Sequence, residues 1–146
     1  MVQVAVFNAH PRRRIASAGI RRVVRGVVGG EGRRTASVTI VFIDGRRSAL
    51  MNRRFLRHRG STDVIAFPLG DTAVEGEVYV NLDRARLQAR TYGVSEANEI
   101  TRLVVHGTLH LLGYDDSAGA LRRRMKARED RYVVALAPQE RRTRSA

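Results

Sequence analysis

Two histidines and an aspartate occur within a short stretch that has the spacing of a metal site. His106 and His110 are four residues apart, so on a helix their side chains lie on the same face, one turn apart, and can reach one metal ion. Gly113 can take the left-handed conformation that ends a helix, after which the chain can bring Asp116 to the same point. Three protein ligands leave a position open for water, which is typical of catalytic zinc sites.

The spacing His-x3-His-x5-Asp also matches the extended motif of zinc proteases, except at one position. That motif has a glutamate directly after the first histidine as general base, whereas this chain has Gly107. Either the base comes from elsewhere or the metal-bound hydroxide suffices, since zinc lowers the pKa of bound water to about 7. We therefore predict a metal site formed by His106, His110 and Asp116 but regard peptide hydrolysis as disfavoured. The alternative is that no metal binds and that the two histidines fall at helical spacing by chance in a partly buried helix.

Length and composition predict one domain that is large enough to fold without a covalent cross-link. The chain has 146 residues and no cysteine, which excludes disulfides and thiolate metal ligands. The first residues lack a basic leader with a long apolar core, and no apolar run approaches the ~20 residues of a membrane helix. We expect a cytoplasmic protein without a membrane partner.

The formal net charge is +13, and all but one of the 27 basic residues are arginine, the exception being Lys126. Arginine grips phosphate oxygens in pairs, so such a surface suits a nucleic acid. A GC-rich coding sequence would explain the choice of arginine but not the excess of positive charge. We expect a polyanionic partner, with RNA, DNA and a generally basic surface as the alternatives.

Sequence periodicity predicts an α+β fold, an α/β sandwich in which a small mixed sheet of about four strands is covered by about five helices. Strands are expected at residues 2–7, 37–43, 61–67 and 77–80, and helices at 11–29, 44–55, 81–93, 95–110 and 117–136. The metal site lies at the C-terminal end of a long helix. Leu50 and Met51 should face inwards, and His10 and His58 should lie on the surface. Residues 1–137 form the single domain, and 138–146 form a basic tail that we expect to be disordered.

Two further groups of residues are candidates for function. Glu99 lies seven residues before His106, within about 20° of the same helix face, and could hydrogen-bond a ligand histidine or assist proton transfer. A glutamate in the first turn is also favoured by the helix dipole alone. The second group precedes a strand, where side chains from a loop can reach a phosphodiester, although exposed arginines are expected anyway at this charge. Its members are Arg53, Arg54, Arg57 and Arg59.

Two stretches resemble the signatures of the YbeY family, bacterial metal-dependent endoribonucleases linked to maturation of the 3′ end of 16S rRNA and to ribosome quality control. Residues 106–116 are similar to His-Gly-x-Leu-His-Leu-x-Gly-Tyr-Asp-His. Residues 52–67 are similar to an Asn followed by an aromatic residue, then Thr-Asp-Val-hydrophobic-x-Phe. The order of elements agrees from residue 2 to about residue 136, so only the basic tail lies outside the resemblance.

The resemblance implies that His106 and His110 bind one Zn²⁺ per chain, and it makes Asp116 the third ligand where most of the family has histidine. The family usually has an arginine directly after the aromatic residue of its second signature, whereas Leu56 follows Phe55 here. The adjacent Arg57 is the candidate catalytic arginine. Glu99 is a candidate for a supporting role behind a ligand histidine, and Arg53, Arg54 and Arg59 are candidate nucleic-acid contacts.

The resemblance thus implies a single-strand-specific zinc-dependent endoribonuclease that hydrolyses RNA phosphodiester bonds with a zinc-bound water. It would act in 16S rRNA 3′-end maturation and 70S ribosome quality control, with ribosomal RNA and the ribosome or its small subunit as partners. Two alternatives stay open: a ribosome-associated assembly factor with little nuclease activity, and a metal-dependent hydrolase of another substrate.

Overall fold

The structure, a computed structural model, describes residues 1–56, 60–70 and 73–139. A four-stranded mixed sheet forms one layer of the fold. Its strands are β1 (Val2–Asn8), β2 (Ala36–Ile43), β3 (Val64–Pro68) and β4 (Glu75–Asn81). They follow the order β1-β2-β4-β3, with β1, β2 and β4 parallel and β3 antiparallel to β4. The predicted hairpin of the third and fourth strands is confirmed.

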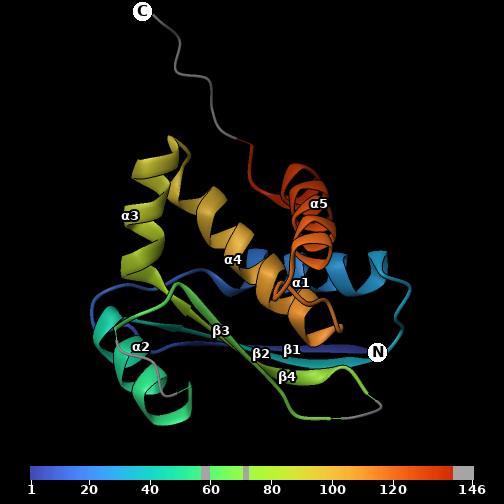
Figure 1. The fold of residues 1–146 in the computed structure, drawn as a ribbon, viewed down its shortest axis with the longest axis horizontal. Helices are drawn as coiled ribbons and strands as arrows, with labels where there is room; N and C mark the ends of the chain where they lie inside the picture. The colour runs from blue at the N-terminus through green and yellow to red at the C-terminus, as the bar shows by residue number, and fades with distance from the viewer. Residues whose placement is uncertain (57–59, 71–72, 140–146) are drawn as a thin grey trace, which may run out of the picture.

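Five α-helices occur in the part of the chain that the structure describes, and four of them lie on one face of the sheet (Figure 1). These four are α1 (Ser17–Gly30), α3 (Leu82–Tyr92), α4 (Glu96–Leu111) and α5 (Gly119–Leu136). α4 lies among the others and packs on β3 and β4. The short α2 (Gly45–Met51) lies below the strands at one end of the sheet in this view. The predicted α+β class is confirmed.

α4 is the most deeply buried helix, and local sequence signals define where it starts. Gly93 ends α3 with a φ of 67°. The Ser95 side chain then caps α4 by accepting from the backbone N–H of Asn98. One side of α4 packs into the core through Leu103, Val104 and Leu109, among others. Because that face packs against the sheet, the rotation of α4 about its axis is fixed, and so is the direction of the side chains on its opposite side.

α1 begins at Ser17 rather than at Pro11, because side chains take up the backbone hydrogen bonds of the preceding segment. Asn8 exchanges two hydrogen bonds with the backbone of Ile15. His10 Nδ1 accepts from the backbone N–H groups of the two arginines that follow Pro11. A helix from Pro11 would direct the Ile15 N–H to the Pro11 carbonyl, but Asn8 accepts that hydrogen bond instead. The contacts to His10 involve N–H groups that a first helical turn leaves free, so the Asn8 bonds are the ones that oppose a helix here.

His10 is not a surface residue, so that prediction is wrong. Its side chain is buried, and its Nε2 lies 2.8 Å from Asp83 Oδ1. Asp83 also accepts from the backbone N–H of Gly45, so this pair ties the end of β1 to the starts of α2 and α3. A partner 73 residues away leaves no local signal in the sequence. His58 lies outside the described residues.

The region after β2 also departs from prediction. Asp44 caps α2 as expected, by accepting from Arg47 N–H, but the helix becomes the π-helical turn η1 (Asn52–Leu56). Leu50 is 53% exposed, and Met51 is only partly buried, because α2 lies at the end of the sheet and not across its face. Among the described residues, no helix is both long enough and apolar enough to cross a membrane.

Candidate metal centre and adjoining cleft

His106, His110 and Asp116 converge at the C-terminal end of α4. Nε2 of His106 lies 3.5 Å from Asp116 Oδ2, and Nε2 of His110 lies 3.6 Å from Asp116 Oδ1. One donor atom from each residue can be chosen so that all lie within 4.8 Å of one another. Tetrahedral zinc with bonds of about 2.0–2.2 Å separates its ligand atoms by about 3.4 Å. The donor set therefore fits a metal ion after small movements, and these residues could bind one.

The turn that brings Asp116 back to α4 is held from outside. Gly113 has a φ of 99°, as expected of a glycine that ends a helix. The next residue, Tyr114, donates its hydroxyl to Glu31 at the end of α1, and Tyr132 donates to the other oxygen at 2.5 Å. Burial raises the pKa of Glu31, but these two hydrogen bonds and nearby arginines outweigh it and lower the pKa. The charged Glu31 therefore anchors the loop that carries Asp116.

Glu129 on α5 orients the first histidine. Its Oε2 lies 2.8 Å from His106 Nδ1, and its Oε1 accepts from Arg102 at 2.8 Å. A carboxylate only accepts, so Nδ1 of His106 carries the hydrogen and Nε2 is free for a metal ion. Burial lowers the pKa of His106, but the hydrogen bond to Glu129 and the charges of Glu129 and Asp116 raise it overall. The same pairing, with Arg102, lowers the pKa of Glu129 against its burial.

Glu129 is a candidate functional residue that the sequence interpretation missed, although a signal was available. It lies four residues after Met125 and three before Tyr132, within the apolar stripe of α5. Only 7% of Glu129 is exposed. An acidic residue inside an apolar stripe requires a partner, and here the partners are His106 and Arg102.

Gly107 faces the sheet, which explains the departure from the zinc-protease motif. A Cβ atom at this position would lie 2.3 Å from Val78 Cγ1 on β4. A side chain there requires Val78 or α4 to move, and it would point into the sheet, so a glutamate at this position could not act as a base at the metal centre. The interpretation that disfavoured peptide hydrolysis therefore has a physical reason in the packing.

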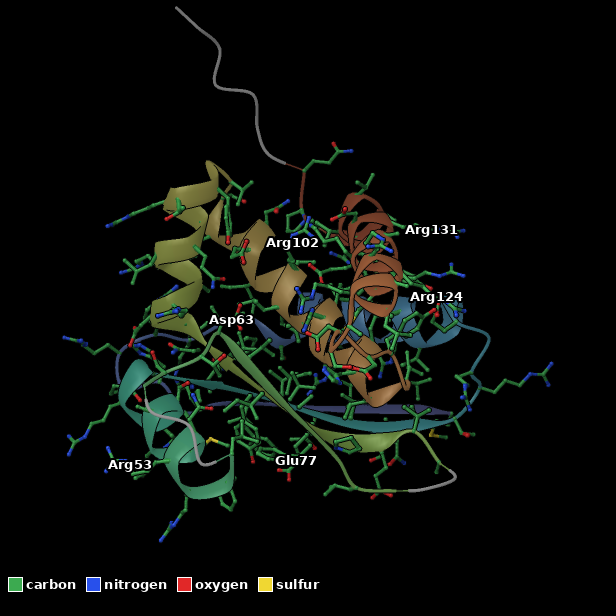
Figure 2. The ribbon with its side chains drawn as sticks, viewed as in Figure 1. Arg53, Asp63, Glu77, Arg102, Arg124 and Arg131 are labelled. Atoms are coloured by element: carbon green, nitrogen blue, oxygen red, sulfur yellow. The ribbon has the colours of Figure 1, made fainter. Side chains whose placement is uncertain are left out.

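A cleft of about 560 Å³ adjoins the metal centre. It is lined by residues of α3, α4 and α5 and by Asp63 before β3, with His106 and Asp116 among them. Figure 2 shows Asp63 and Arg102 on the helix-covered side of the sheet. Glu99 also lines the cleft, is 2% exposed, and has a pKa raised by burial. The carboxylate that pairs with His106 is Glu129, so the role of Glu99 stays a prediction.

Of the arginines selected from sequence, the structure describes Arg53 and Arg54, and neither lines the cleft beside the candidate metal centre. Arg53 and Arg54 are exposed on η1, and Arg53 lies on the opposite side of the sheet from Arg124 and Arg131 (Figure 2). Arg57 and Arg59 lie outside the described residues. Among the residues that the structure describes, the cations that line the cleft are Arg102, Arg122 and Lys126.

Known proteins resemble this chain over most of its length. The family model described as endoribonuclease YbeY matches residues 7–137. A protein of Chlorobium luteolum named endoribonuclease YbeY is 39% identical, over 92% of this chain and 98% of the relative. One of the same name from Salinibacter ruber is 34% identical, over 92% of each chain. The solution structure of a Thermotoga maritima protein has the same fold, with a TM-score of 0.68 and 23% identity over 92% of this chain and 89% of the other.

Proposed function

Because this chain belongs to the YbeY family of endoribonucleases, we propose that it hydrolyses phosphodiester bonds of single-stranded RNA at His106, His110 and Asp116. The observation that carries this proposal is the convergence of these three side chains beside an open cleft. Two imidazoles and one carboxylate suit Zn²⁺, and we propose one ion per chain. When bound, the ion would polarise a phosphate oxygen and make water a stronger nucleophile at neutral pH.

The residues around the ligands have distinct proposed tasks. Glu129 holds His106 in one orientation and tautomer, which keeps its Nε2 directed at the site. Arg122 and Lys126 on α5 line the cleft and would bind phosphates of the RNA backbone. Arg57 as a catalytic residue and Glu99 in proton transfer stay proposals. The same holds for the RNA contacts proposed for Arg53, Arg54 and Arg59.

We also propose a cytoplasmic role in maturation of the 3′ end of 16S rRNA and in ribosome quality control, with the small subunit or ribosome as partner. The relatives' name and the net charge of +13 support an RNA substrate. A ribosome-associated assembly factor with little nuclease activity is the rival proposal. Leu56 supports it, because an apolar side chain, 41% exposed, stands where the family usually has an arginine.

Metal content and RNA cleavage, measured on the same samples, test the proposal. Purified wild type should hold about one zinc per chain and cleave a single-stranded RNA, and Asp116→Ala should lose both. Asp115→Ala is the matched control, because Asp115 is the exposed neighbour and its hydrogen bonds come from Ser117 and the Asp116 backbone, not from the two histidines. It should keep both properties.

Each contrary result has a separate meaning. Equal metal content in wild type and Asp116→Ala would show that Asp116 is not a ligand. A metal-loaded wild type that cleaves no RNA would favour the assembly factor, and cleavage of a casein-type substrate but not of RNA would favour another hydrolase.

A further inference from the structure

The cleft beside the metal centre has the size and lining of a pocket for one nucleobase. Its volume of about 560 Å³ falls within the range of about 300–1,000 Å³ that is usual for small-molecule sites. Leu103 and Met125 are buried and supply apolar surface, and the exposed ring of Tyr92 stands at the end of α3. Apolar side chains and an aromatic ring are the surfaces on which proteins stack unpaired bases.

The polar groups of the cleft are rich in hydrogen-bond acceptors. Asp63 and Glu99 contribute carboxylates, and Gln88 and Asn98 contribute amides. Asp63 Oδ2 accepts from Gln88 Nε2 at 3.1 Å, which holds these two side chains in place. Burial raises the pKa of Glu99 even though Arg102 acts in the opposite direction. Hydrogen bonds from a ligand would favour its charged form.

The cleft also has a cationic wall at a suitable place for the RNA backbone. Arg122 and Lys126 project from the start and middle of α5, and both side chains are exposed. Arg122 Nε donates to the backbone carbonyl of Asp116, so it stands next to the metal centre. A base in the cleft would therefore have cations and the three metal-binding residues close to its phosphates.

We propose that this cleft binds an extruded base adjacent to the scissile phosphodiester and prefers bases that present N–H donors, guanine most and uracil least. This inference rests on the proposed function. Guanine offers an N–H and an amino group side by side, which match the two oxygens of a carboxylate such as Glu99. Both Asp63 oxygens already accept hydrogen bonds, from Val64 N–H and from Gln88 Nε2. Adenine and cytosine offer one amino group each. Uracil offers one N–H between two carbonyl acceptors, which would face the acceptors of the cleft.

Binding of the four nucleoside 5′-monophosphates to the metal-free full chain, measured by isothermal titration calorimetry, tests this pocket without relying on catalysis. GMP should bind more tightly than UMP by about 5- to 150-fold, the discrimination expected of one good bidentate contact. Glu99→Gln should remove most of that difference, and Gln88→Ala, which removes another side chain that lines the cleft, should reduce it. Glu77→Gln and Gln3→Ala are the controls, because both residues lie on strands outside the cleft and should leave the preference unchanged.

Thermal unfolding shows whether Glu99→Gln and Gln88→Ala are folded. If one of them does not fold, the other still tests the inference. Equal affinity for the four nucleotides overturns the inference, and so does a preference that survives in both cleft variants. The proposed function is tested separately, by sequencing the ends that the metal-loaded protein produces from a random single-stranded RNA. If the protein cleaves RNA without base preference and binds the four nucleotides equally, the base pocket is refuted and the nuclease function is supported. If GMP binding depends on Glu99 but no RNA is cleaved, the pocket is supported and the nuclease function is refuted.

Discussion

Replacing Glu129 by glutamine tests whether a carboxylate on α5 prepares His106 for metal binding. Glutamine has nearly the same size and can still accept from His106 Nδ1, but it removes the charge from both the 2.8 Å contact to His106 and the 2.8 Å contact to Arg102. Charged hydrogen bonds are roughly twice as strong as neutral ones. Loss of such an outer partner typically weakens metal binding by about 10- to 100-fold, or about 1.4–2.7 kcal/mol.

Asp130→Asn is the matched control for this substitution. Asp130 also accepts from Arg102, at 2.7 Å, but its other ion pair is with Lys126 and not with a histidine. About half of its side chain is exposed, so the loss of these ion pairs should cost at most about 1 kcal/mol of unfolding free energy. The metal affinity of this variant should equal that of wild type.

Competition for Zn²⁺ against a chromophoric chelator gives the affinities, and thermal unfolding with excess EDTA gives the stability of the metal-free chains. Without metal, the unfolding free energy of Glu129→Gln should be lower than that of wild type by about 1–3 kcal/mol, because the buried hydrogen bonds to His106 and Arg102 lose their charged acceptor. The loss should not be larger, because Arg102 keeps Asp130 as a partner. Equal zinc affinity in Glu129→Gln and wild type would refute the reasoning. A loss of equal size in Asp130→Asn would show that the effect comes from Arg102 and not from His106.

Three further predictions concern packing, pH and salt. Gly107→Ala should lower the unfolding free energy by about 1–3 kcal/mol, because its Cβ would overlap Val78, whereas Gly19→Ala on α1 has no atom within 4 Å and should be neutral or stabilising in the same denaturant titration. Glu31 has a lowered pKa when folded, so its stabilisation is present above its ordinary value of 4.5 and is lost as the pH falls through the folded value. Wild type should therefore be more stable than Glu31→Gln at pH 7, and a difference that did not shrink below pH 4.5 would contradict this. RNA binding by the +13 chain should weaken as the salt concentration rises. A plot of log binding constant against log salt concentration should have a slope of about −3 to −4, as expected for about five phosphates of a single strand. An affinity that does not change with salt in filter-binding assays would exclude the basic surface as the RNA-binding surface.

The parts of this fold that sequence predicts well are those with local causes. The cap at Ser95 and the left-handed Gly93 define the α3–α4 junction within a few residues. The spacing of His106 and His110 places both imidazoles on one helix face whatever surrounds it. Asp116 follows because a glycine turn limits where the chain can go next.

The parts that sequence could not predict depend on contacts between distant segments. Glu129 meets His106 across the interface of two helices, 23 residues apart in the chain. Gln88 and Asp63, which are 25 residues apart, meet only because α3 packs beside the start of β3. Single patterns do not encode such pairs, although an acidic residue within an apolar stripe, as at Glu129, shows that a partner exists.

The close packing at Gly107 also determines which parts of the metal centre can change during evolution. Substitutions on the inner face of α4 must be matched on β4, so the register of His106 and His110 is held by the core. Asp116 lies on the turn outside that packing, and its side chain is 44% exposed. A different ligand at position 116 needs no repacking of α4. Position 116 is thus the part of the candidate metal centre at which the side chain can change without disturbing the packing of α4 on the sheet.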